Sequence, residues 1–359
     1  MAARTQRPSA LTDVEAIIRQ VRDSPLAMAN VANTLLLEKG QSDRAMDLCD
    51  QALALAPMDG EVRHIRAEVF SQDVGYWYVS TLMDEARHAA YDRALRRALA
   101  GGGRVLEIGV GTGLFAMMAA RAGADEVISC ERRPAVARAA RAVVARNGFS
   151  DKIKIIGKSS SDLEIGADMD GLVDVLIWDN LANDLVGAGA LPALEDAVAR
   201  LVKPGGQVLP SRVAIKAALA DDPKYNLRRL EGVDGFDLSP FNVLAKPVYS
   251  LRTEPDDVAI RSDTAVLFDF DFRTSGPFPA ARTDQTVIGV GGQATGIVQW
   301  LHFTVDDQEV YEPGPGSGAW AFGLEFHPAA APFEAASGAN FTIKASHDRD
   351  RLRIWLGNG

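Results

Sequence analysis

Hydrophobic and polar positions divide the chain into three regions of different periodicity. Over residues 11–70 apolar residues recur every three to four positions, which predicts helices. From residue 76 to about 211 short apolar runs alternate with helical runs, which predicts a parallel, doubly wound sheet. Beyond residue 212 short β-rich segments separated by Gly and Pro predict an antiparallel β-barrel or sandwich. We therefore expect regions over 1–75, 76–211 and 212–359.

The N-terminal helical pattern contains one hairpin-like unit. Residues 24–57 divide at Gly40 into two helical runs, with small residues where paired helices must approach closely, and Pro57 ends the second run. This unit resembles a single tetratricopeptide repeat. One repeat cannot stack with itself, so we favour a helical cap packed on the next domain over a peptide-binding groove.

The charge and cysteine content of the chain limit the kinds of ligand and partner that we expect. The 359 residues include 48 acidic and 38 basic side chains, for a net charge of −10, which argues against nucleic acid and would attract a cationic substrate. The two cysteines, Cys49 and Cys130, have no metal-ligand spacing, so we predict neither a metal site nor a disulfide scaffold. The chain has no apolar leader and no run of eighteen apolar residues. We therefore expect a cytoplasmic protein without a membrane partner.

A glycine-rich turn follows the first predicted strand of the α/β domain. In "RVLEIGVGTGL", Glu107 ends the strand, and Gly109, Gly111 and Gly113 let the backbone approach a ligand closely. The next strand, "EVISCE", ends at Glu131, where a carboxylate can accept both hydroxyls of a ribose. NAD and S-adenosylmethionine both fit this pair. Glu107 favours S-adenosylmethionine, because a carboxylate repels a pyrophosphate but attracts an ammonium.

Longer motifs resemble a known enzyme family. The stretches "VLEIGVGTGLFAMMAARAGADEVISCE", "RNGFSDKIKII" and "DLVGAGALPALEDA" resemble the protein arginine methyltransferases, particularly the branch with monomethylating and tetratricopeptide-bearing members. The resemblance covers about residues 76–355. It implies a Rossmann-like class I methyltransferase domain followed by a β-barrel, with S-adenosylmethionine as cofactor.

The resemblance also assigns cofactor contacts. The segment "YVSTLMDEARHAAY" is similar to the family's helix before the first strand, which makes Arg87 the clamp for the cofactor carboxylate and Tyr78 a lid. A guanidinium binds a carboxylate through two parallel hydrogen bonds, which agrees with this assignment. Lys158, Ser159 and Ser160 stand where the family contacts the adenine.

The substrate loop departs from the family pattern. The family carries two glutamates nine residues apart on this loop, and the matching positions here are Asp179 and Ala188. A carboxylate pair localises the charge of a guanidinium away from its attacking nitrogen and aligns that nitrogen with the methyl donor. Asp179 keeps one charge. We expect Asp184, with Asn180 and Asn183, to replace part of what Ala188 lacks.

Two further segments complete the resemblance. The family's Thr-His-Trp loop corresponds to "SGAWAFGLEF", in which Trp320 is kept as a substrate-pocket residue and Ala319 replaces the histidine. Residues 225–242 resemble the arm through which family members dimerise, so we expect a homodimer with two-fold symmetry.

The leading interpretation is an S-adenosylmethionine-dependent N-methyltransferase that acts on an arginine guanidino group. The guanidino group belongs either to free arginine or a related small molecule, or to a peptidyl arginine. Two alternatives stay open at this point: a methyltransferase for another nucleophile, and a catalytically silent scaffold that binds the cofactor.

Overall fold

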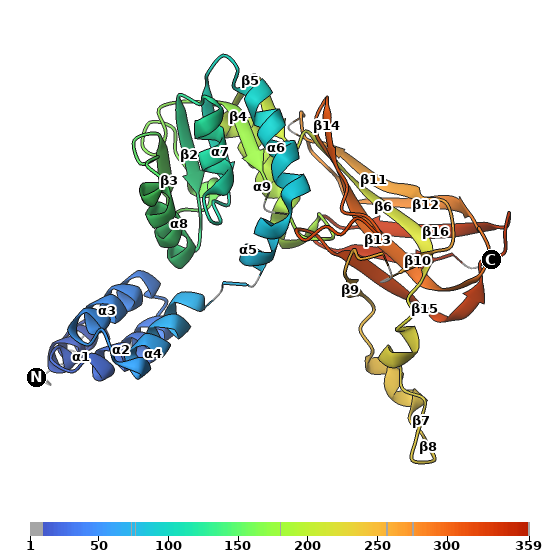
Figure 1. The fold of residues 1–359 in the computed structure, drawn as a ribbon, viewed down its shortest axis with the longest axis horizontal. Helices are drawn as coiled ribbons and strands as arrows, with labels where there is room; N and C mark the ends of the chain where they lie inside the picture. The colour runs from blue at the N-terminus through green and yellow to red at the C-terminus, as the bar shows by residue number, and fades with distance from the viewer. Residues whose placement is uncertain are drawn as a thin grey trace, which may run out of the picture.

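The computed structural model describes residues 10–72, 74–75, 77–179, 181–255, 258–274 and 276–357. The chain is elongated, with an N-terminal helical bundle, an α/β domain beside it and a β-rich domain at the far end (Figure 1). In the part of the chain that the structure describes, no helix is long and apolar enough to cross a membrane.

The N-terminal helices pack around a core of their own. Met28, Leu36, Met46 and Cys49 are buried in it. The predicted break at Gly40 is confirmed, since its φ of +66° ends one helical run before the next begins. The helices of this bundle are α1 (Ala10–Val21), α2 (Pro25–Val31), which continues as a helical turn over Ala32–Leu36, α3 (Ser42–Leu55) and α4 (Gly60–Ser71).

The predicted parallel α/β sheet is also confirmed. Its strand order is β3-β2-β1-β4-β5, and all neighbouring strands run parallel. Both faces are covered, so β1 and β2 read as continuous buried runs. The strands are β1 (Arg104–Ile108), β2 (Glu126–Cys130), β3 (Ile153–Ile156), β4 (Val173–Trp178) and β5 (Val202–Leu209). The helices are α5 (Trp77–Ser80), α6 (Glu85–Ala98), α7 (Leu114–Ala122), α8 (Pro134–Arg146) and α9 (Ala190–Leu201).

The order of the strands fixes where a ligand binds. The chain runs from β1 outward to β2 and β3, then returns to the other side of β1 with β4. Ligands of open α/β sheets bind outside the carboxyl ends of the strands at such a switch point. Glu107, Glu131 and Asp179 all lie at this edge, near or just after the ends of β1, β2 and β4.

The β-rich domain consists of two antiparallel sheets. A seven-stranded sheet contains β6 (Arg212–Asp221), β9 (Tyr249–Leu251), β10 (Ala259–Ile260), β11 (Ala265–Asp271), β13 (Gln293–Asp306), β14 (Glu309–Tyr311) and β15 (Leu324–Glu334). A three-stranded sheet contains β12 (Ala281–Ile288), β16 (Asn340–His347) and β17 (Leu352–Leu356).

The antiparallel β-rich domain, predicted as a barrel or sandwich, is therefore confirmed, and within the described residues its sheets stay open. Among the described residues the two sheets do not join into one hydrogen-bonded ring. The segment between β11 and β12 carries Pro277 and Pro279. The N–H of Phe278, between these prolines, donates to a carboxylate oxygen of Glu195 in α9, so the segment is held by the α/β domain and not by a strand ladder.

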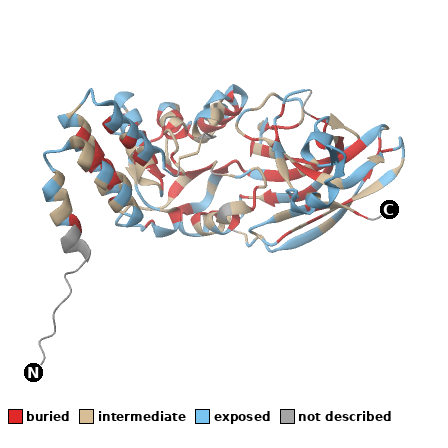
Figure 2. Cartoon of the chain, turned by 90° about the horizontal axis from the view of Figure 1, so that it is seen from below, coloured by how far each residue is buried: buried red, intermediate tan, exposed pale blue. Residues whose placement is uncertain are grey.

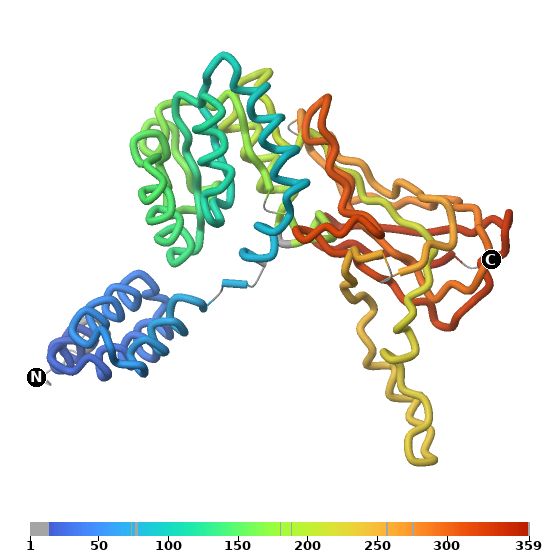
Figure 3. The backbone as a smooth tube through the Cα atoms, viewed as in Figure 1, coloured from blue at the N-terminus to red at the C-terminus, as the bar shows by residue number. Residues whose placement is uncertain are grey.

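A narrow arm leaves the β-rich domain between β6 and β9. It contains short helical turns over Tyr225–Arg228 and Ser239–Leu244 and a hairpin of β7 (Gly232–Val233) and β8 (Phe236–Asp237). The tube trace shows the arm projecting away from both sheets (Figure 3). Apolar side chains on it are exposed, including Leu227, Phe236, Phe241 and Val243.

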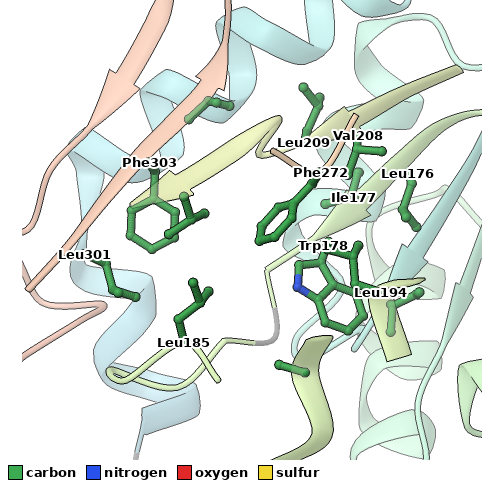
Figure 4. Packing of buried hydrophobic residues seen from close by; sticks show 14 of the residues in the cluster. Leu176, Ile177, Trp178, Leu185, Leu194, Val208, Leu209, Phe272, Leu301 and Phe303 are labelled. Carbon is green, nitrogen blue, oxygen red and sulfur yellow. The ribbon is translucent and has the colours of Figure 1, made fainter. Parts of the chain in front are cut away.

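One hydrophobic core runs through the α/β and β-rich domains. Buried residues lie along the strands of the α/β domain and of the β-rich domain (Figure 2). At the junction, Ile177 and Trp178 of β4 lie near Phe272, and Leu185 lies near Leu301 and Phe303 of β13 (Figure 4). The loop after β4 is therefore held between the two domains.

Candidate functional site

A cavity of about 870 Å³ opens at the carboxyl ends of β1, β2 and β4 and reaches the β-rich domain. Most of the residues predicted from the sequence line it. These are Tyr78, Arg87, Glu107, Gly109, Gly111, Glu131, Lys158, Ser159, Ser160, Asp179 and Trp320. Gly113 and Asp184 are not among the lining residues.

The glycine turn has two separate tasks. Gly109 and Gly111 line the cavity with φ values of +86° and +51°, in the left-handed region that favours glycine. Gly113 caps the start of α7 with a φ of +83°. A Cβ there would lie 3.2 Å from Cγ2 of Val144 in α8, so this glycine serves helix packing.

Glu107 lines the cavity as a buried carboxyl group. Its Oε2 accepts a 2.6 Å hydrogen bond from the hydroxyl of Ser129. Burial raises the pKa of Glu107 to about 8. The side chain is therefore largely protonated at neutral pH, and a cationic ligand group beside it would favour the carboxylate form.

Glu131 presents a carboxylate at the end of β2. Its Oε1 accepts a 2.9 Å hydrogen bond from the backbone N–H of Arg133. Across the described residues, no group donates a hydrogen bond to Oε2, which leaves that oxygen available to ligand hydroxyls. The Arg133 guanidinium also donates to the hydroxyl of Tyr78 at 3.2 Å, which places the Tyr78 ring at the same end of the cavity.

Arg87 and Asp179 form a buried ion pair in the lining of the cavity. Nη2 of Arg87 contacts Oδ2 of Asp179, and Nε donates to Oδ1 at 3.3 Å. The hydroxyl of Tyr91 donates to the same Oδ1 at 3.0 Å. The Arg87 guanidinium also lies 4.7 Å from the ring centre of Phe115, a cation–π contact. The sequence predicts that Arg87 binds the cofactor carboxylate and that Asp179 binds the substrate guanidinium. In the folded chain the two side chains contact each other.

Asp84 is a positioning residue that the sequence analysis missed. Its Oδ2 accepts from the hydroxyl of Tyr311 at 2.6 Å and from the backbone N–H groups of Trp320 and Ala321 at 2.8 and 3.0 Å. Its Oδ1 accepts from the N–H of Arg87, as expected of a helix N-cap. Burial alone would raise the pKa of Asp84, but these hydrogen bonds outweigh burial and lower it. An aspartate directly before α6 was the available signal.

Hydrogen bonds anchor the loop after β4. Asp184, on this loop, does not line the cavity. Oδ1 of Asp184 accepts a 3.1 Å hydrogen bond from the N–H of Gly187, and burial raises the pKa of this carboxyl group. The amide of Asn183 donates to Glu325 and accepts from the N–H of Gly323. Asn180 and the side chain of Ala188 lie outside the described residues. The expected auxiliary carboxylate is thus not brought to the cavity.

The three residues predicted to contact the adenine also line the cavity. The ammonium of Lys158 donates to both oxygens of Asp168, at 2.9 and 2.8 Å, so its charge is engaged outside the cavity. Ser160 is buried, and its carbonyl accepts from Arg200 at 3.1 Å. The backbone here is therefore fixed.

The β-rich domain also contributes to the lining of the cavity. Trp320 is about half exposed, and its ring centre lies 5.9 Å from the guanidinium carbon of Arg252. Arg252 and Glu254 also line the cavity. No sequence pattern singled them out, because the segment that carries them has no regular structure.

Comparisons with known proteins agree with this geometry. A family profile described as "Methyltransferase domain" matches residues 105–206. The arginine N(omega)-methyltransferase of Streptomyces achromogenes subsp. streptozoticus is 35% identical over 260 residues, which cover 71% of this chain and 72% of that protein. Protein arginine N-methyltransferase 7 of Danio rerio is 34% identical over 253 residues, which cover 64% of this chain and 37% of the relative.

Solved structures show the same fold. A chain of the Trypanosoma brucei PRMT1 enzyme–prozyme heterotetrameric complex with AdoHcy matches with a TM-score of 0.70 at 22% identity, over 80% of this chain and 96% of that one. Arabidopsis thaliana protein arginine methyltransferase 10 matches with a TM-score of 0.65 at 17% identity, over 80% and 98%. With the sequence identity to the Streptomyces enzyme, these matches show that the chain belongs to the protein arginine methyltransferase family.

Proposed function

We propose that this protein transfers a methyl group from S-adenosylmethionine to a guanidino nitrogen of arginine. The observation that carries the proposal is the position of Asp179. This carboxylate lies in the same cavity as the glycine turn and Glu131, at the end where the α/β domain meets the β-rich domain. The names of the related proteins support arginine as the methyl acceptor.

The residues of the cavity fit the cofactor. Oε2 of Glu131 is available to the ribose hydroxyls, Gly109 and Gly111 leave room for close backbone approach, and the Arg87 guanidinium matches a carboxylate. Glu107 suits the cofactor's ammonium, because a neighbouring cation shifts its carboxyl group towards the charged form. Bound S-adenosylmethionine supplies an electrophilic methyl group on a sulfonium.

Asp179 has two tasks in this proposal. Its negative charge holds the guanidinium and draws positive charge away from the nitrogen that attacks. A guanidinium that gains a methyl group must lose a proton, and a carboxylate in contact with it can accept that proton. The hydroxyl of Tyr91 donates to Oδ1 of Asp179 and holds the carboxylate in place.

Arg87 must give up Asp179 when ligands bind. In the structure the two charges satisfy each other. A cofactor carboxylate offers Arg87 another partner, and a substrate guanidinium offers Asp179 another partner. Each ligand therefore lowers the cost of binding the second, because a buried charge without a partner is unfavourable.

We further propose that the protein is a homodimer joined through the arm. Leu227 and Val243 are each 85% exposed, and Phe236 and Phe241 are also exposed. Apolar side chains gathered on a projecting segment are typical of an interaction surface. A second copy of the chain is the partner that the family resemblance implies.

The test of the proposed function is incubation of the purified protein with labelled S-adenosylmethionine and either free arginine or an arginine-containing peptide. Label on a guanidino nitrogen supports it. Binding of S-adenosylhomocysteine without transfer to any guanidine would instead indicate a silent scaffold.

A further inference from the structure

Two oppositely charged residues stand at the β-domain end of the cavity without a role in the proposed chemistry. Arg252 and Glu254 follow β9 and line the same cavity as Asp179 and Trp320. Both are exposed to solvent. Side chains that line the cavity and remain exposed to solvent are available to bind a ligand.

The segment that carries them is fixed by the residue between them. Thr253 is buried, and its hydroxyl donates a 2.8 Å hydrogen bond to the carbonyl of Ala319. The N–H of Gly318 donates to the carbonyl of Thr253 at 3.2 Å. Arg252 and Glu254 are therefore held beside the segment that carries Trp320, not on a free loop.

Neither charge is neutralised within the chain. Within the described ranges no carboxylate pairs with Arg252, no cation pairs with Glu254, and the two do not pair with each other. The contact of Arg252 is with the Trp320 ring, at 5.9 Å.

A cation at this position conflicts with the charge of the expected substrate. A guanidinium that enters towards Asp179 is repelled by Arg252. The main chain of a peptide is neutral next to the arginine. A peptide substrate therefore offers no anionic main-chain group to offset the repulsion from Arg252. A substrate that carries an anionic group close to its guanidinium turns the repulsion into an attraction.

We infer that Arg252 and Glu254 select free arginine as the substrate, with Arg252 binding the α-carboxylate and Glu254 the α-ammonium. This inference rests on the proposed function and narrows its substrate class to an amino acid with both main-chain charges. A peptidyl arginine has amides in place of these two charges, so it leaves both residues without partners. The pair then disfavours peptides as well as favouring the amino acid.

The test compares four acceptors: L-arginine, agmatine, which lacks the carboxylate, Nα-acetylarginine, which lacks the ammonium, and Nα-acetylargininamide, which lacks both charges. We expect the wild type to prefer arginine over agmatine by roughly 10- to 100-fold in kcat/KM, as for a charge-assisted hydrogen bond. Arg252→Met should bring that ratio close to one. Glu254→Gln should do the same for the ratio of arginine to Nα-acetylarginine.

Arg282→Met is the matched control. The Arg282 guanidinium also lies over a tryptophan ring, that of Trp355 at 5.2 Å, but Arg282 is on β12 and does not line the cavity. Its substrate ratios should equal those of the wild type. Thermal unfolding of each variant verifies that it folds.

Three results overturn the inference alone: a wild type that methylates Nα-acetylargininamide as well as arginine, an Arg252→Met variant that keeps the preference for arginine over agmatine, or a wild type that methylates only a longer arginine-containing peptide. A wild type that methylates neither the four acceptors nor such a peptide overturns the proposed function together with the inference. The acceptor panel therefore separates the two failures.

Discussion

Arg87 and Asp179, 92 positions apart in the chain, form an ion pair with side chains only 7% and 13% exposed. Each residue has a separate assignment, Arg87 to the cofactor carboxylate and Asp179 to the substrate guanidinium. Under the proposed assignments, each ligand competes with a group of the protein for its partner.

Asp179→Asn should tighten the binding of S-adenosylhomocysteine, because the cofactor carboxylate no longer competes with Asp179 for Arg87. Arg87→Ala should have the opposite effect and weaken binding by roughly 1–3 kcal/mol, as expected when a charged hydrogen bond is lost. Calorimetry with both variants measures the two directions. Equal weakening in both variants would show that the pair does not separate when the cofactor binds.

Glu131→Ala should weaken binding of the same ligand by roughly 1–3 kcal/mol, because the ribose hydroxyls lose their carboxylate acceptor. The matched control is Glu126→Ala, since Glu126 lies at the opposite end of β2 and pairs with Arg104. Calorimetry should find the affinity of Glu126→Ala unchanged. Wild-type affinity in Glu131→Ala would remove this residue from the cofactor site.

The stability of the ligand-free protein should depend on pH through Glu107. Its pKa in the folded state is raised from 4.5 to about 8 by burial, so between these values the folded state holds a proton that the unfolded state has released. Stability contributed by this group therefore falls as pH rises through that window. Glu107→Gln has no proton to lose, so its melting temperature relative to wild type should increase from pH 5 to pH 9. A constant difference across that range would contradict the assignment.

Replacement of residues 226–241 by a short linker should convert a dimer into a monomer, because it removes the exposed apolar side chains Leu227, Phe236 and Phe241. Light scattering on wild type and deletion variant measures this. The variant should also bind S-adenosylhomocysteine less tightly if the partner's arm supports the α/β domain. A wild-type protein that is monomeric at micromolar concentration would refute the dimer.

Much of the fold could be predicted from local sequence patterns. The parallel sheet could be predicted because buried strands and amphipathic helices alternate over 76–211, and the glycine turn because positive φ values at Gly109 and Gly111 favour residues without a Cβ. The open arrangement of the antiparallel sheets could not, since strand pairing there joins segments far apart in the chain.

The site was predictable in its residues but not in their pairings. Most predicted residues line one cavity, yet the contact of Arg87 with Asp179 and the bonds from Tyr311 and Trp320 to Asp84 depend on tertiary packing. Asp184 is a predicted site residue that does not line the cavity. Its charge suggested a substrate role, but its side chain is engaged by the backbone of Gly187. Residue type alone does not give the direction of a loop side chain.

The most direct test of the central claim is a methylation assay with wild type, Asp179→Asn and Asp184→Asn, using labelled S-adenosylmethionine and L-arginine, with mass spectrometry to locate the methyl group. We predict methyl transfer to a guanidino nitrogen by the wild type. We also predict a loss on the order of a hundredfold or more in Asp179→Asn, because a charge that stabilises the reacting group is removed. Asp184→Asn, whose side chain lies outside the cavity lining, should lose much less. A wild type that methylates no guanidine in free arginine or in arginine peptides, or an Asp179→Asn variant as active as wild type, would contradict the account.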